Sequence, residues 1–130
     1  MPEHPNVVAV RRGYDAFNKG ETDTLTELLG EDVVWHVPGR SPIAGDYRGR
    51  EATMAYFGRL DELTAGSYQA DLQIAVGDDE HVISIDRSTA TSETARYDEN
   101  ELVVFRFRDG RVVEAWQAMM NLYAHDEFFS

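Results

Sequence analysis

The sequence predicts an α+β fold, in which a curved antiparallel sheet carries three helices from the N-terminal half of the chain on one face. Three observations predict this class. Up to residue 67 the apolar residues recur mostly at helical spacing, and from residue 68 they alternate as in strands. The length of 130 residues suits one domain with its own hydrophobic core. Because no internal repeat or linker-like run is found, we expect one domain over residues 1–130.

Three segments of the first half have the features of helices. Between residues 6 and 18 the apolar side chains fall on one face, and Lys19-Gly20 supplies a basic last turn and a stop. The spacing of Thr24 and Glu27 is that of a capping box and predicts a short second helix. Residues 50–63 are rich in helix-forming residues and predict a third helix. The apolar residues assigned to the first helix are Val7, Val10, Tyr14 and Phe17.

The first strand is expected within this helical half. Residues 33–37 are β-branched and aromatic, and they stop at Pro38-Gly39. Residues 40–49 contain a proline and two glycines, so we expect a loop there.

Four further strands are expected after residue 67. Residues 68–76 alternate, and the other three strands are expected at 81–91, 101–108 and 111–123. Asp109-Gly110 is a strong hairpin signal between the last two. The alternation places Tyr68, Ala70, Leu72, Ile74 and Val76 on one face of their strand.

Charge and composition exclude several classes of function. The chain has 24 acidic and 12 basic residues and a formal charge of −12, so we expect no nucleic-acid partner and no membrane-surface partner. Cysteine is absent, which excludes thiol chemistry and Cys-ligated metals. No metal site is expected because the four histidines lack ligand spacing, and no cofactor is expected because phosphate-loop and dinucleotide patterns are missing. The N-terminal segment has no basic and apolar leader pattern, and we expect a cytoplasmic protein.

In several stretches the sequence resembles the SnoaL-like branch of the ketosteroid isomerase and nuclear transport factor two-like superfamily. The resemblance rests on residues 12–20, 35–39, 41–52, 105–116 and 122–128, taken in order. It implies a cone-shaped, cystatin-like fold whose helices pack on the concave face of the sheet. It also implies a cavity for a small apolar molecule and a homodimer. Members of this superfamily include isomerases, cyclases, hydrolases and non-catalytic modules, so the fold alone does not define the reaction.

The catalytic residues of the family are only partly matched. Comparison with ketosteroid isomerases places Val37 at the catalytic base and Val103 at the oxyanion-hole aspartate, so the usual carboxylates are absent. Tyr14 alone falls at or next to a family catalytic position, where it would donate a hydrogen bond to an oxyanion. At the position of the SnoaL carboxylate the sequence has Asn121, which cannot take a proton at neutral pH.

Two titratable residues remain as candidates for proton transfer. Asp86 lies in mid-strand among apolar residues and would be a general base with a raised pKa if it faced the cavity. Alternatively it faces outward, or pairs with Arg106 on a neighbouring strand. His36 is the second candidate, because an imidazole can titrate near neutral pH. Strand alternation, however, turns His36 to the opposite sheet face from Trp35. If Trp35 faces the cavity, His36 would instead form hydrogen bonds in a dimer interface.

We expect the remaining site residues to bind the ligand, although aromatic residues of this kind are more often part of a core. The tail at residues 123–129 either closes the cavity mouth or covers a sheet edge. The predicted ligand-binding residues are Trp35, Met54, Tyr56, Phe105, Trp116, Gln117, Met119 and Asn121.

The leading hypothesis is therefore a SnoaL-like protein that binds a small apolar metabolite and isomerises, cyclises or hydrolyses it without a cofactor. The competing hypothesis is a non-catalytic module for ligand binding or dimerisation. A third is a protein-binding module, which a large apolar patch on the exposed sheet face would favour.

Overall fold

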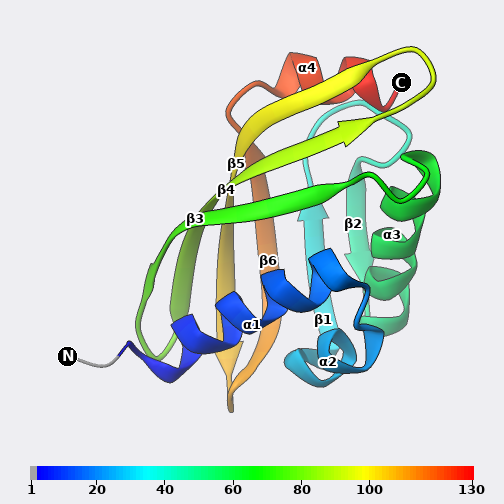
Figure 1. Ribbon diagram of the computed structural model, residues 1–130. Helices are drawn as coiled ribbons and strands as arrows, with labels where there is room; N and C mark the ends of the chain where they lie inside the picture. Colours follow the sequence, from blue (N-terminus) through cyan, green and yellow to red (C-terminus); the bar gives the residue numbers. More distant parts are fainter. Residues whose placement is uncertain (1–2) are drawn as a thin grey trace.

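The computed structural model describes residues 3–130, and in that range it contains four helices and one six-stranded sheet (Figure 1). Residues 1–2 of the N-terminal segment analysed above lie outside the described range. The elements in chain order are α1 Pro5–Lys19, α2 Thr22–Leu28, β1 Leu29–Val37, β2 Gly45–Arg48, α3 Arg50–Leu63, β3 Gln69–Gly77, β4 His81–Thr91, β5 Arg96–Arg108, β6 Arg111–Met119 and α4 Leu122–Phe128.

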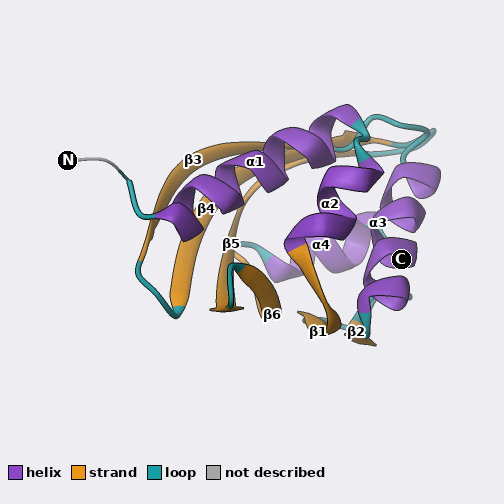
Figure 2. Ribbon diagram, turned by 90° about the horizontal axis from the view of Figure 1, so that it is seen from below, coloured by secondary structure: helices purple, strands orange, loops and turns teal. Residues whose placement is uncertain are grey.

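The strands lie in the order β2-β1-β6-β5-β4-β3. Neighbouring strands are antiparallel except β1 and β6, which run parallel and so join the N-terminal and C-terminal halves of the sheet. The sheet curves, and α1, α2 and α3 lie on its concave side (Figure 2). The predicted α+β class with helices on the concave face is confirmed. No helix among residues 3–130 is long and apolar enough to cross a membrane.

The predicted helices are present, with one error in how α2 begins. In α1 the side chain of His4 accepts a hydrogen bond from the Asn6 backbone N–H, and Gly20 ends the helix at a φ of 71°. The expected capping box at Thr24 is wrong: α2 begins after Glu21, which makes no side-chain cap. The residue at which this seven-residue helix begins is therefore determined by tertiary packing and not by a capping side chain.

Several expected boundaries are wrong because they depend on partners far away in sequence. β1 begins at Leu29 and not at residue 33, and β5 begins at Arg96 and not at residue 101. The predicted loop at residues 40–49 contains β2, which is only four residues long and pairs with β1. The predicted strand at 111–123 ends at Met119 and is followed by α4. Asn121 caps this fourth helix by accepting a hydrogen bond from the Ala124 backbone N–H at 3.1 Å.

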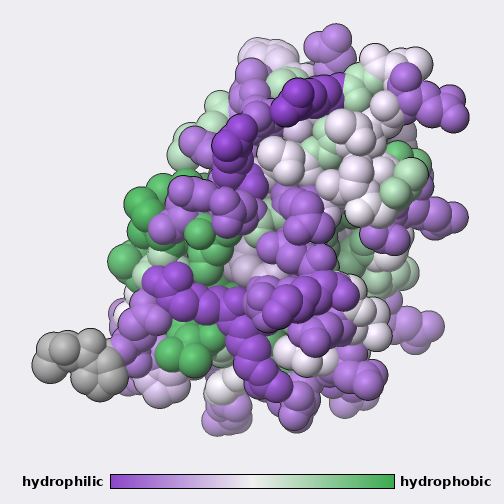
Figure 3. Space-filling model, in the orientation of Figure 1, coloured by the Kyte–Doolittle hydropathy of each residue, from purple (hydrophilic) through white to green (hydrophobic). Residues whose placement is uncertain are grey.

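A bulge in β3 overturns the expected single apolar face of that strand. The pairing with β4 shifts between Leu72 and Ile74, so the side chains after the bulge change sides. Ile74 is consequently 52% exposed and Val76 57% exposed, whereas Ala75 is buried. Figure 3 shows hydrophobic residues on the surface over this β3–β4 part of the sheet, beside α1.

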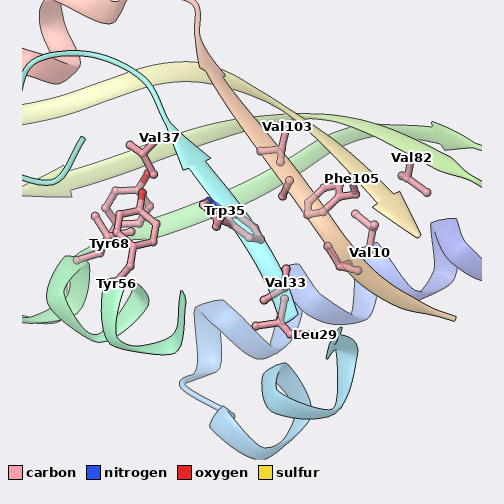
Figure 4. Packing of buried hydrophobic residues seen from close by; sticks show 14 of the residues in the cluster. Val10, Leu29, Val33, Trp35, Val37, Tyr56, Tyr68, Val82, Val103 and Phe105 are labelled. Carbon is pink, nitrogen blue, oxygen red and sulfur yellow. The ribbon is translucent and has the colours of Figure 1, made fainter. Parts of the chain in front are cut away.

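The core lies between the concave face of the sheet and the helices. Val10 of α1, Tyr56 of α3, Trp35 of β1 and Phe105 of β5 all belong to one buried cluster (Figure 4). The rings of Trp35 and Phe105 meet edge to face at 5.9 Å, and those of Trp35 and Phe57 at 5.0 Å. This aromatic packing is interrupted by a pocket that contains the polar residues described next.

Candidate active site in the pocket under the helices

A pocket opens between α1, α2, α3 and the concave face of the sheet. The space not occupied by atoms within it amounts to about 780 Å³, including its opening to solvent. The helices contribute mostly apolar and aromatic side chains, and the sheet contributes two carboxyl groups, a hydroxyl and an amide. Within the described part of the chain, no Lys, Arg or His lines it. The polar residues contributed by the sheet are Asp86, Ser88, Glu101 and Gln117.

Asp86 of β4 faces this pocket. The buried residues of β4 alternate, and Asp86 is 2% exposed, so the outward orientation and the pairing with Arg106 are both wrong. Its carboxylate accepts hydrogen bonds at 2.7 Å from the hydroxyl groups of Tyr14 and Ser88. Burial raises the pKa of Asp86, and these two hydrogen bonds partly oppose the rise.

Glu101 of β5 is the residue that the sequence analysis missed. It is 2% exposed and accepts hydrogen bonds from Tyr97 at 2.8 Å, Tyr68 at 3.3 Å and the Gln117 amide at 3.3 Å. Burial, followed by the charge of Asp86, raises the pKa of Glu101 to about 7. A signal was present, because Glu101 shares strand parity with three buried residues, Val103, Phe105 and Phe107.

Gln117 links Glu101 to the aromatic wall. Its amide oxygen accepts hydrogen bonds from the Trp35 indole at 2.6 Å and the Tyr56 hydroxyl at 2.9 Å, and its amide nitrogen donates to Glu101. Since both ends of the amide are engaged, its orientation is set by this network. The predicted pocket residues that the structure brings together are Tyr14, Trp35, Tyr56, Asp86, Phe105 and Gln117.

The proton of Tyr14 is already engaged. Its hydroxyl donates to Asp86 and lies 2.8 Å from the Ser84 hydroxyl oxygen. Burial, followed by the charge of Asp86, raises the pKa of Tyr14 well above its usual value. The phenol is therefore a neutral donor that holds Asp86, which differs from the expected role of a donor free to meet an oxyanion.

His36 and Trp116 lie on the opposite, convex face of the sheet, and neither lines the pocket. The His36 ring nitrogens lie 2.7 Å from carboxylate oxygens of Asp46 and Glu114, and its ring stacks on Trp116. The hydrogen bond to Glu114 is the largest cause that raises the pKa of His36. These contacts correct the assignment of His36 to proton transfer and of Trp116 to ligand binding, because alternation along β1 and β6 turns both side chains away.

Three further expectations for ligand binding are also corrected. Met54 and Met119 are partly buried and pack against the core cluster, but neither lines the pocket. Asn121 is used as the cap of α4 and does not line the pocket.

The C-terminal tail supports the Glu101 end of the pocket from outside. β5 pairs with β6 only from Glu101 onward, and α4 lies beside the preceding end of β5 (Figure 1), so the tail covers this locally free edge of the strand. The rings of His125, Phe128 and Phe129 surround Tyr97, whose hydroxyl donates to Glu101. No residue of α4 is among those lining the pocket in the described chain, so the tail does not close its mouth.

The site has the chemistry of proton transfer. Among residues 3–130 no cluster of three or more His, Cys, Asp and Glu side chains has the arrangement of a metal site. The pocket instead combines two buried carboxyl groups, hydroxyl and amide donors that orient them, and aromatic walls. Such an arrangement can hold and move one proton next to an apolar molecule.

Comparisons with known proteins agree with this architecture. The solved structure of Bal32a, from a soil-derived mobile gene cassette, is 46% identical in sequence, with 97% of each chain covered and a TM-score of 0.95. IdmH from Streptomyces antibioticus, a candidate polyketide cyclase, is 26% identical, with 93% of this chain and 97% of its own covered and a TM-score of 0.77. The uncharacterized protein Rv0034 of Mycobacterium tuberculosis is 25% identical over the full length of both chains.

The family comparison covers most of the chain. The model of the SnoaL-like domain matches residues 10–115, from the middle of α1 to the middle of β6. The matched segment includes Tyr14, Asp86 and Glu101 of the pocket. The chain belongs to the SnoaL-like domain family.

Proposed function

We propose that this protein is a cofactor-free acid–base enzyme that isomerises or cyclises a small, largely apolar molecule. The observation that carries the proposal is the pair of buried carboxyl groups, Asp86 and Glu101, which lie directly opposite each other on the pocket face of β4 and β5. Two carboxyl groups in such positions cannot both ionise easily at neutral pH, because the two negative charges repel each other in a medium of low polarity.

The two groups divide the roles of acid and base. The pKa of Glu101 is raised to about 7, partly by the charge of Asp86, so Glu101 carries a proton in about half of the molecules at pH 7 and in most of them at slightly lower pH. Because Glu101 Oε2 already accepts from two tyrosines, the proton is carried on Oε1, which meets only the Gln117 amide. Asp86 is then the ionised base and Glu101 the acid.

The reaction follows from this division. A ketone in the pocket loses a proton from the carbon next to its carbonyl to Asp86, while Glu101 gives its proton to the carbonyl oxygen, which produces an enol. Where the ketone has a carbon–carbon double bond next to that carbon, the enol is a conjugated dienol. Asp86 returns its proton to the far carbon of the dienol while the enol hydroxyl returns its proton to Glu101, and the double bond has then moved, which completes an isomerisation. In a cyclisation the enol carbon instead attacks a second carbonyl, whose oxygen takes the proton from Asp86 while the enol hydroxyl returns its proton to Glu101. The pair ends with the protons that it had at the start, so no other reactant is needed.

Three residues keep the pair in place. Tyr14 donates to Asp86 and Gln117 donates to Glu101, so each carboxyl group has a fixed orientation. Trp35 fixes Gln117 in turn through its indole N–H, and its ring also forms part of the pocket wall. The 26% identity to IdmH, a candidate polyketide cyclase, also supports the proposal. Cyclisation by attack of an enol carbon on a carbonyl is the chemistry proposed here for Asp86 and Glu101.

Carbon-acid exchange tests this function without knowledge of the natural substrate. A small bicyclic ketone such as tetralone is incubated with the full chain in D₂O, and loss of its exchangeable C–H signal is followed by proton NMR. We expect the wild type to catalyse exchange, and Asp86→Asn and Glu101→Gln each to lower the rate about 100-fold, the usual contribution of a positioned acid or base.

The matched control is His36→Gln, which changes a titratable residue on the convex face and leaves the rate unchanged. Exchange no faster than in buffer contradicts the proposal. Binding of tetralone to the pocket without exchange would assign the protein to non-catalytic ligand binding instead.

We also propose that the protein is a homodimer that buries the convex face of β4, β5 and β6. Ile83 is 42% exposed and Trp116 36% exposed on this face, and Val104 lies between them in the sheet, opposite both. A continuous apolar face of this kind on an otherwise strongly acidic chain is suited to a second copy of the same surface.

A further inference from the structure

The two carboxyl groups of the pocket have no cationic partner among residues 3–130. Asp86 and Glu101 accept hydrogen bonds from hydroxyl groups and an amide alone, and no basic side chain lines the pocket in the described residues. On the convex face, by contrast, the partly buried Glu114 meets Arg106 as well as His36. The pocket carboxyl groups therefore lack the cationic partners that this carboxylate has.

The same pocket is lined with aromatic rings, whose faces attract cations. Trp35, Tyr56, Phe57 and Phe105 lie on the side of β1, α3 and β5, and Tyr14 and Phe17 lie on the side of α1. Rings and carboxylates together are the groups that bind an organic ammonium ion, because the rings contact its apolar substituents and the carboxylates neutralise its charge. A formal charge of −12 over the whole chain also attracts cations to the opening.

We propose that the molecule bound in this pocket is an apolar amine, whose protonated nitrogen lies between Asp86 and Glu101 while its ring system contacts the aromatic walls. The inference rests on the proposed function, since it concerns the same pair of carboxyl groups. The acid–base mechanism by itself requires only that the substrate can form an enol. The inference adds that the substrate also carries a cationic nitrogen.

Binding of such a cation changes the state of the pair. A positive charge next to both carboxyl groups removes the repulsion between them, so Glu101 gives up its proton when the amine enters. With an amine bound, the ammonium group of the substrate therefore takes the role of the acid that Glu101 has with a neutral ketone, and Glu101 becomes a second base. Amine binding near neutral pH is therefore coupled to the release of a proton, whereas binding of a neutral molecule is not.

Three probes with the same ring and different charges test the inference. Naphthylmethylamine, naphthylmethanol and naphthoic acid are titrated into the full chain by calorimetry near pH 7, in two buffers of different ionisation enthalpy. We expect the amine to bind about tenfold more tightly than the alcohol, the acid to bind most weakly, and only the amine to release a proton to the buffer.

The variants locate the effect in the pocket. Asp86→Asn and Glu101→Gln are each expected to remove most of the preference for the amine over the alcohol while the alcohol still binds. Glu114→Gln removes one negative charge from the convex face and is the matched control, with the preference unchanged. Because the alcohol reports pocket integrity, a misfolded variant is recognised by loss of alcohol binding.

Two results overturn the inference. One is an alcohol that binds as tightly as the amine, and the other is an amine whose binding is absent or releases no proton. In either case the proposed function is still supported if the exchange of tetralone protons depends on Asp86 and Glu101. The substrate would then be a neutral molecule. If tetralone protons do not exchange, the proposed function itself is contradicted. The binding and exchange experiments therefore distinguish failure of the amine inference from failure of the proposed function.

Discussion

Asp86 of β4 and Glu101 of β5 are a directly opposed cross-strand pair on the pocket face of the sheet. The strands on which they lie are joined by a short connection, so the pair is placed by the most regular hairpin of the fold, with eleven residues of β4 in register. Two like-charged groups at opposed positions are usually avoided in antiparallel sheets because they repel. Their presence here, in a buried pocket, is best explained by a shared proton.

The coupling between the two groups predicts that Asp86→Asn lowers the pKa of Glu101. The charge of Asp86 is the second largest cause of the raised pKa of Glu101, after burial, so its removal leaves burial alone to raise the value. The measurement is a carbon-13 NMR titration of the Glu101 carboxyl group in both proteins. An unchanged value near 7 in the variant would show that the two groups are not coupled.

Glu101→Gln is expected to change how stability depends on pH. The pKa of Glu101 is raised from 4.5 to about 7, so the folded state holds the proton more firmly than the unfolded state. Stability from this group is complete below about pH 4.5 and decreases as the pH rises to 7, by roughly 3 kcal/mol in total. Glutamine has no such proton, so the variant gains stability relative to wild type as the pH rises.

Urea unfolding at several pH values between about 4 and 8 measures this difference. Replacement of Glu51, an exposed glutamate in the first turn of α3, by Gln is the matched control and leaves the pH dependence as in wild type. A constant difference between wild type and Glu101→Gln at all pH values would contradict the prediction.

His125→Phe is expected to stabilise the protein. His125 is 1% exposed, and its Nδ1 has no hydrogen-bond partner among the described residues. Its ring lies between those of Tyr97 and Phe129, where phenylalanine would make similar contacts without a buried polar atom. The expected gain in the free energy of unfolding is about 1–3 kcal/mol at pH 7. A loss of stability would show that the imidazole has a partner that phenylalanine cannot replace.

The same variant also carries a pH prediction of opposite sign to that of Glu101. Burial lowers the pKa of His125 from 6.5 to about 4, so the unfolded state binds the proton more readily. Stability from this group is complete above about pH 6.5 and is lost as the pH falls towards 4. Urea unfolding at pH values of roughly 5 and 7 is therefore expected to show a larger gain for His125→Phe at the lower pH.

Gly13 in the middle of α1 is expected to control the size of the pocket. A Cβ built on Gly13 would meet Leu28 at 3.5 Å, an ordinary contact, and Gly13 itself lines the pocket. Gly13→Ala should therefore raise the free energy of unfolding by about 1 kcal/mol, as glycine is a poor helix former. Gly13→Leu should keep the fold and prevent tetralone from binding. Thermal unfolding and NMR titration measure the two effects, and tight binding by the leucine variant would contradict them.

Ile83→Lys tests the proposed dimer. Ile83 lies on the convex face, away from the pocket, so a charge there interferes with contact between copies and leaves Asp86 and Glu101 in place. We expect light scattering to report twice the 14.7 kDa chain mass for wild type and 14.7 kDa for the variant. Exposed Glu93 replaced by Lys is the matched control and keeps the dimer. A wild-type mass of 14.7 kDa would contradict the dimer.

Much of the fold could be predicted because its signals are local. The helices at residues 5–19 and 50–63 and the strand at 81–91 follow from the spacing of apolar residues along a few turns or one strand. The elements that were missed have no strong local signal. β2 is stable only beside β1, and the bulge at Leu72 is visible only in the pairing with β4.

By itself, the sequence determined the α+β class, three of the four helices, five of the six strands, the acidic charge and the resemblance to SnoaL-like proteins. It also placed Asp86 in mid-strand, whereas Glu101 was missed although it shares the parity of buried residues on β5. Only the tertiary structure decided that these two carboxyl groups face one pocket, opposite each other, while His36 and Trp116 lie outside it. The reason is that strand register and burial arise from contacts between distant segments, and those contacts shift the pKa values that make the pair chemically useful.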